Sequence, residues 1–161
     1  MAKIHAYLNF NGNCEEAFRF YAAAFKTEII SLMRFSDMPE DPNFPIPEQD
    51  KNKVLHTGIA INDNQYIMGT DCLESMGQRA TSGTNAYIML DASSVEEAEE
   101  LFDALSVDAQ TIEMSLGETF FAERFASFID KFGIPWMIHY EGSKKMSQDT
   151  QQPSKGLLII F

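Results

Sequence analysis

Histidine is the most versatile chemical group in this chain, because a neutral imidazole can bind a transition metal and can also exchange a proton near neutral pH. The three histidines, His5, His56 and His139, fall on three separate segments whose alternation of apolar and polar residues predicts β-strands. Side chains from three strands can converge on one metal ion. The alternative is that each histidine forms an ordinary hydrogen bond or lies at the surface, and spacing alone leaves both open.

The other reactive side chains show no catalytic spacing. Cys14 and Cys72 match no C-x-x-C or zinc pattern, so we interpret them as two reduced, partly buried thiols. Asp71 follows a predicted strand and either acts as an acid or base or caps the turn into Cys72 and Leu73. Residues 77–83 lack the strand and helix context of a nucleotide loop, and no Ser/His/Asp order is present.

Composition narrows the class of partner. The chain has 161 residues and a formal charge of −12, and its surface field therefore repels nucleic acid and anionic membranes. It contains no apolar run of 18 residues and no signal-peptide order at its start, which predicts a cytoplasmic protein. With 45% hydrophobic residues it can bury a core without disulfides. We expect a small-molecule partner.

The elements that must position these side chains occur twice along the chain. In the first copy, Asn13 and Glu16 have the spacing of a capping box at a helix start, and residues 37–50 carry four prolines, which predicts a long ordered loop or lid. The elements expected in this copy are a strand over 3–10, a helix over 14–25, a strand over 28–35 and a hairpin of 54–61 with 65–69.

The second copy repeats this order. Ser93 or Ser94 caps its helix. Residues 118–132 fit a helix by the spacing of their phenylalanines, but the repeat predicts a short turn over 118–122 followed by a strand, and we favour the strand. The other elements expected are a strand over 85–90, a helix over 95–105, a strand near 110–114, a turn over 130–133 and a strand over 134–141.

A repeat of this length is about half a domain, so it predicts two copies of one unit packed together, with function where they meet. The expected parts are a first βαβββ module (1–72), a linker (73–83), a second βαβββ module (84–141) and a tail (142–161). The tail ends in five apolar residues, 157–161, which predicts either an added edge strand or groove contact, or a disordered end. The fold class is α+β.

Four stretches carry a resemblance to a known family: YLNFNGNCEEAFRFYAAAF at 7–25, RFSDMP at 34–39, YIMGTD at 66–71 and DKFGIPWMI at 130–138. Together they resemble the PhnB-like branch of the vicinal oxygen chelate superfamily, which includes glyoxalases, bleomycin resistance proteins and dioxygenases, over residues 3–141. The resemblance implies tandem βαβββ modules that form a curled mixed β-sheet around a cavity with helices outside, often completed by a homodimer. It specifies the fold more strongly than a reaction.

Metal-dependent members of this superfamily take four ligands from the first and fourth strands of each module. Here those positions carry His5, then Met68 or Thr70, then Asn85, then Met137. A thioether suits soft ions, and catalytic divalent sites need about three good protein ligands, so we predict no catalytic metal. If a metal does bind, His5 is its first ligand, and the alternative function is a metal-dependent lyase, isomerase or dioxygenase using His5 with His56, His139 or Asn85.

The leading hypothesis is therefore a cavity that binds a small apolar or amphipathic organic molecule without a cofactor. Proteins of this branch carry labels that refer to phosphonate metabolism or to ubiquinone methyltransferases. Neither label is supported here, because the sequence has no glycine-rich methyl-donor loop and no basic cluster for a phosphonate. The candidate pocket residues are His5, Tyr7, His56, Met68, Asn85, Met137 and His139.

Overall fold

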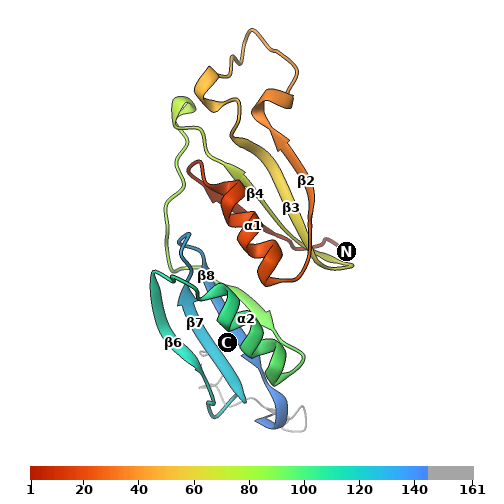
Figure 1. Ribbon diagram of the computed structural model, residues 1–161, viewed down its shortest axis with the longest axis vertical. Coiled ribbons are helices and arrows are strands. Elements are labelled where there is room, and N and C mark those ends of the chain that lie inside the picture. Colours follow the sequence, from red (N-terminus) through yellow and green to blue (C-terminus); the bar gives the residue numbers. More distant parts are fainter. Residues whose placement is uncertain (145–161) are drawn as a thin grey trace.

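The computed structural model describes residues 1–144 and shows the predicted order of elements twice (Figure 1). The first module contains β1 (Ala6–Phe10), α1 (Cys14–Ala24), β2 (Ile29–Arg34), β3 (Val54–Asn62) and β4 (Gln65–Asp71). The second contains β5 (Ile88–Asp91), α2 (Val95–Leu105), β6 (Thr111–Gly117), β7 (Arg124–Ile129) and β8 (Pro135–Tyr140). The α+β class is confirmed, and so is the strand that the repeat predicted after residue 122. The predicted tail strand lies outside the described residues.

Each module forms one four-stranded mixed sheet. The strand orders are β1-β4-β3-β2 and β5-β8-β7-β6, and the outer pairs β1–β4 and β5–β8 are parallel while the remaining neighbours are antiparallel. Within residues 1–144 the two sheets do not close into a barrel. They lie end to end along the molecule, and α1 and α2 cover the same side of both (Figure 1). Within the described residues, the tandem modules therefore form two open mixed sheets with a helix packed on each.

Two strands, β1 and β5, begin three residues later than predicted. β1 starts at Ala6 and not at Lys3, so Ile4, placed on the apolar face by alternation, is 90% exposed. β5 starts at Ile88, and Asn85 therefore lies before the strand and not in it. Both differences have one cause, because a strand begins only where a neighbour supplies hydrogen bonds, and alternation cannot show where that neighbour begins.

The start of α1 corrects the predicted capping box. Asn13 is the N-cap residue, but its side chain makes no capping hydrogen bond. Asp71 at the end of β4 supplies the acceptor instead, since its Oδ1 accepts from the backbone N–H groups of Gly12 at 2.9 Å and Cys14 at 3.0 Å. α2 follows the predicted rule, because Ser94 accepts from the backbone N–H of Glu97.

The modules share one core, and a buried carboxylate lies where they meet. The Asp130 Oδ2 atom accepts from the Tyr21 hydroxyl of α1 at 2.6 Å and from the Trp136 Nε1–H of β8 at 2.8 Å. The Oδ1 atom accepts from the backbone N–H groups of Phe132 and Ile134. Asp130, Tyr21 and Trp136 are fully buried. This arrangement joins the first helix to the second sheet.

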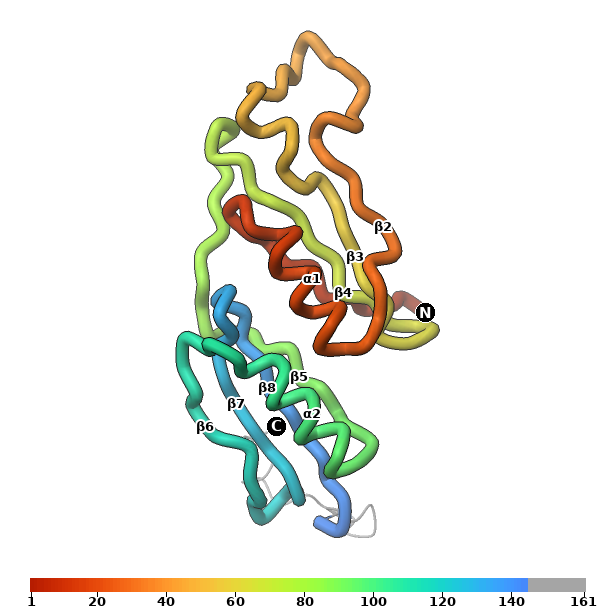
Figure 2. Tube along the Cα trace, in the orientation of Figure 1, coloured from red at the N-terminus to blue at the C-terminus, as the bar shows by residue number. Residues whose placement is uncertain are grey.

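The proline-rich segment between β2 and β3 extends beyond the first sheet (Figure 2). It contains short 3-10 helices at Phe35–Asp37 and Glu48–Asp50 and otherwise irregular backbone, as expected for a long ordered loop. Buried Asp50 fixes its end by accepting from Ser75 and by pairing with Lys53 Nζ at 2.8 Å. In the described part of the chain, no helix has the length and apolar character needed to cross a membrane.

Candidate functional site

The face of the first sheet that points away from α1 carries three of the predicted pocket residues. A Cβ added to Gly69 would meet Phe18 of α1, so the Gly69 position faces the helix and its neighbour Met68 faces away. Tyr7 of β1 and Gly58 of β3 both pair with Met68, so all three positions share one face of the sheet. His56 lies two residues before Gly58 on the same strand and therefore points to that face as well. The structure therefore brings Tyr7, His56 and Met68 together on one open face.

Tyr7 and His56 form a polar pair on this face. The Tyr7 hydroxyl lies 3.3 Å from His56 Nδ1, and the two ring centroids are 5.8 Å apart. Partial burial raises the pKa of Tyr7, with a further contribution from Cys14, so the phenol stays protonated at neutral pH. Its ring is still 48% exposed. The pair offers a ligand a hydrogen-bonding hydroxyl beside an imidazole.

His5 lies apart from this pair, before β1. Its Nδ1 accepts from the backbone N–H of Tyr66 at 3.3 Å, and its ring meets the Tyr66 ring edge-on at 5.3 Å. This is the hydrogen-bonded alternative that the sequence left open for each histidine. His5 therefore supports the hairpin of the first sheet in the single chain.

On the second sheet, Met137 and His139 share the face opposite α2. His139 Nδ1 lies 2.9 Å from Asp91 Oδ1, and the Phe121 ring stacks on the imidazole at 6.5 Å between centroids. Phe121 and Phe125 form a small buried cluster against which Met137 packs. Side chains of the chain itself therefore fill this part of the predicted pocket.

A polar cluster on the same sheet was missed by the sequence reasoning. The Tyr87 hydroxyl donates to the Glu113 carboxylate at 2.8 Å, and the Ser127 hydroxyl donates to the same carboxylate at 2.8 Å. The hydrogen bond with Glu113 raises the pKa of Tyr87. The three residues are far apart in the sequence, and the only available signal was a glutamate between Ile112 and Met114 in a predicted strand.

Among the cavities next to the first sheet, two are lined by Tyr7. The intermodule cavity, of about 880 Å³, lies between the start of β1, residues 79–88 and the turn at 132–135. The loop cavity, of about 600 Å³, lies beneath the proline-rich segment, against β3 and β4. Tyr7 lines both cavities and Asn85 lines the first. His5, His56, Met68, Met137 and His139 line neither, so the single chain does not gather the seven candidates in one pocket.

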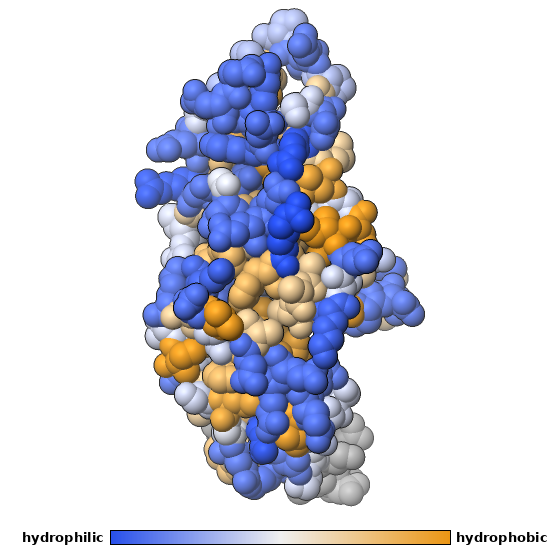
Figure 3. All heavy atoms as spheres, viewed as in Figure 1, coloured by the Kyte–Doolittle hydropathy of each residue, from blue (hydrophilic) through white to orange (hydrophobic). Residues whose placement is uncertain are grey.

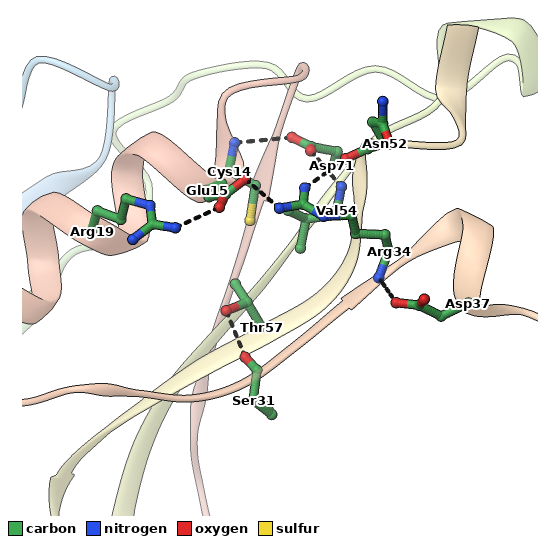
Figure 4. A network of polar contacts seen from close by, with 10 residues as sticks. All are labelled: Cys14, Glu15, Arg19, Ser31, Arg34, Asp37, Asn52, Val54, Thr57 and Asp71. Atoms are coloured by element: carbon green, nitrogen blue, oxygen red, sulfur yellow. Dashed lines mark hydrogen bonds and ion pairs between the residues drawn. The ribbon is translucent and has the colours of Figure 1, made fainter. Parts of the chain in front are cut away.

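Asp71 is committed to holding the fold and is not free for chemistry. Figure 4 shows it beside the start of α1 and the start of β3, in contact with Cys14 and Val54. Besides the two bonds at the start of α1, its Oδ2 accepts from the backbone N–H of Val54 at 2.8 Å. We predicted that Asp71 could cap the turn into Cys72 and Leu73. Its carboxylate instead caps the start of α1 and accepts from the first residue of β3. Burial, followed by the charge of Asp71, raises the pKa of the Cys14 thiol.

A divalent metal finds no fitting donor set in the described chain. Within residues 1–144, no three His, Cys, Asp or Glu side chains lie close enough together to hold an ion. His5 is engaged with Tyr66 and His56 with Tyr7, while the thioethers of Met68 and Met137 suit only soft ions. The residues present therefore do not fit the metal centre that the superfamily pattern implies.

Comparison with known proteins identifies the family. The profile of the 3-demethylubiquinone-9 3-methyltransferase family matches residues 2–139. The chain belongs to this family. It is the PhnB-like branch of the vicinal oxygen chelate superfamily.

Relatives of this PhnB-like chain agree with the assignment. Protein YjdN of Escherichia coli is 34% identical over 143 residues, which cover 83% of this chain and 91% of that protein. The crystal structure of protein PA1353 from Pseudomonas aeruginosa matches with a TM-score of 0.75 at 33% identity, over 88% of this chain and 98% of the other.

Two further solved structures have related folds. The Bacillus cereus structure named as a putative 3-demethylubiquinone-9 3-methyltransferase, PhnB protein, has a TM-score of 0.66 at 28% identity over 86% and 99% of the two chains. The fosfomycin resistance protein FosX of Listeria monocytogenes, solved with Mn(II), matches at 13% identity over 89% and 94% with a TM-score of 0.54. The FosX likeness concerns the fold alone.

Proposed function

We propose that this PhnB-like protein binds a small organic molecule in the loop cavity and its junction with the intermodule cavity, without a catalytic divalent metal. The observation that carries the proposal is the lining of the loop cavity. Its walls combine apolar side chains of the proline-rich segment, among them Phe35, Met38 and Phe44, with the hydroxyl of Tyr7. Cavities of 300–1,000 Å³ with an apolar lining and a few polar groups are typical of small-molecule sites.

We further propose that the working unit is a homodimer. Exposed apolar side chains lie on the faces of both sheets that point away from the helices: Tyr7 and Met33 on the first sheet, Met89 and Met114 on the second. On the helix side of the molecule, hydrophilic residues surround apolar patches near the middle (Figure 3). Exposed apolar sheet faces favour contact with a second copy, and light scattering of the purified protein should then give twice the chain mass of 18.2 kDa.

A cytoplasmic location fits the two unpaired cysteines.

A pair of matched variants tests the binding proposal. Phe44 lies on the proline-rich segment, lines the loop cavity and is 58% exposed, so Phe44→Ser removes an apolar wall at little risk to the fold. Phe120 is 64% exposed and lines neither cavity, so Phe120→Ser is the control. With octanamide as a neutral probe, calorimetry should show binding that Phe44→Ser weakens by about tenfold, equivalent to ~1.4 kcal/mol of lost apolar contact.

Equal affinities of both variants for octanamide, or no binding at millimolar concentration, would contradict the proposal. Metal analysis of protein purified without a histidine tag is the second arm. A stoichiometric divalent metal that is lost on His5→Ala would refute the metal-free part and favour the alternative of a metal-dependent enzyme.

A further inference from the structure

One cation of this acidic protein lies without an ion pair at the point where the two cavities meet. Arg79 lines the intermodule cavity and the loop cavity. The other three arginines all pair with glutamates: Arg19 and Arg34 with Glu15, and Arg124 with Glu99. Within the described residues no such carboxylate partner is found for Arg79. The chain has twice as many acidic as basic side chains, so most cations can find a carboxylate partner, and a guanidinium without one at a cavity wall is unusual.

The backbone around Arg79 is fixed to the first module. Asn11, in the turn after β1, accepts from the backbone N–H of Ala80 at 2.8 Å and donates to the carbonyl oxygen of Ala80 at 2.9 Å. This two-point contact joins the linker to the turn. Arg79 is therefore held next to the open end of β1 by the residue that follows it, although its own side chain is exposed.

The surroundings of Arg79 favour an anion. No aspartate or glutamate lines the intermodule cavity, and only Asp71 lines the loop cavity. Glu74 lines a smaller cavity that Arg79 also lines, but it shares that cavity with the cationic Lys53. The Asp71 oxygens already accept three backbone N–H groups, from Gly12, Cys14 and Val54. Two neutral hydrogen-bonding groups, the Asn9 amide and the Tyr7 hydroxyl, line both cavities together with Arg79.

The loop cavity leads from this polar junction into an apolar space. Besides the three junction residues, its lining is dominated by side chains without charge: Phe35, Met38, Phe44, Ile46, Leu55 and Met76. A ligand with one end at Arg79 and the other in this space must be amphipathic. Its polar end must be an acceptor, because a guanidinium donates hydrogen bonds and accepts none.

We propose that Arg79, Asn9 and Tyr7 bind the carboxylate of an amphipathic organic acid whose apolar part occupies the loop cavity. This inference rests on the proposed function and specifies the ligand class of the same site. Arginine suits this role because its planar fork can bind both carboxylate oxygens. The acid is bound and oriented by these groups, and no covalent step is implied.

Octanoate and octanamide are the probes, because they share a chain and differ in the charge of the head group. Wild-type protein should bind octanoate about tenfold more tightly than octanamide, the ratio expected when a charge-assisted hydrogen bond replaces a neutral one. Arg79→Gln should remove this preference, because it should weaken octanoate binding about tenfold more than octanamide binding. Lys3→Gln, which removes an exposed charge outside both cavities, should leave the preference intact.

The outcomes separate the two proposals. Octanamide binding that depends on Phe44, with no preference for octanoate or no effect of Arg79→Gln, overturns the organic-acid inference and leaves the proposed function standing. An equal loss of preference in Lys3→Gln shows that net charge and not the Arg79 site is responsible, and also overturns the inference. Failure of both probes to bind in a Phe44-dependent way refutes both proposals.

Discussion

The buried carboxylate of Asp130 should be a principal support of the contact between the two modules. It accepts four hydrogen bonds, two from side chains on different modules and two from the backbone of its own turn. Asp130→Ala leaves the Tyr21 hydroxyl and the Trp136 Nε1–H without their acceptor in a fully buried place. Each unsatisfied buried donor costs about 1–3 kcal/mol, so the two side-chain donors alone predict a loss of roughly 2–6 kcal/mol in unfolding free energy.

The isosteric Asp130→Asn variant sharpens the test. One of its two terminal atoms must be an NH2 group, which would face either Trp136 Nε1–H or the backbone N–H groups of Phe132 and Ile134, all of which only donate. We therefore expect Asp130→Asn to cost about 2–4 kcal/mol although its shape is nearly unchanged. Tyr21→Phe removes one donor and leaves the carboxylate with three, so its cost should be smaller, about 1.5–3 kcal/mol.

Chemical denaturation of the three variants and the wild type, with Asp103→Asn as a control on the exposed face of α2, measures these differences. In thermal unfolding, a loss of 2–4 kcal/mol should lower Tm by roughly 5–15 °C in a protein of this size. An Asp130→Asn variant within about 0.5 kcal/mol of the Asp103→Asn control would refute the reasoning. It would mean that the packing of Tyr21 against Trp136 holds the modules together without the carboxylate.

Two further predictions concern the first module. Gly69→Ala should lower the unfolding free energy by about 1–3 kcal/mol, because the added Cβ would lie 2.5 Å from a ring carbon of Phe18. Gly58→Ala is the control and should lower it clearly less, because its nearest contact is at 3.4 Å. Equal losses in chemical denaturation would contradict the close approach of α1 to β4. Thiol labelling of the native protein should modify Cys72 well before Cys14, since Cys14 is fully buried and burial raises its thiol pKa, which keeps the reactive thiolate scarce at neutral pH. Comparable labelling rates at pH 8 would show that the start of α1 opens readily.

The elements were largely predictable because they depend on local patterns. The helix at Val95–Leu105 and its Ser94 cap follow from spacing within one turn, and the repeat decided correctly in favour of a strand over Arg124–Ile129, where local periodicity alone was ambiguous. The cap of α1 was not predictable in the same way. Asn13 has a suitable side chain in the right place, but the acceptor that satisfies the helix start comes from Asp71, more than fifty residues later.

The candidate site shows the same division. The predicted pocket set contains Tyr7, Met68 and His56, which lie on one face of the first sheet. Residue spacing could not show that Phe121 and Phe125 would pack beside Met137 and His139, or that Tyr66 would engage His5. Arg79 lies in a linker with no periodicity, and nothing in its neighbours marks it. Its position became visible only through the contact of Asn11 with Ala80.

By itself, the amino-acid sequence determined the duplicated βαβββ order, the acidic surface and the weak set of metal donors, since these depend on residue type and on spacing within single elements. The tertiary structure alone decided that the two sheets remain open within residues 1–144, that Asp71 and Asp130 are structural acceptors, and that Tyr7, Asn9 and Arg79 line both cavities. The physical reason is that cavities and buried hydrogen bonds are formed between segments distant in sequence, where packing selects one arrangement from many that the local patterns allow.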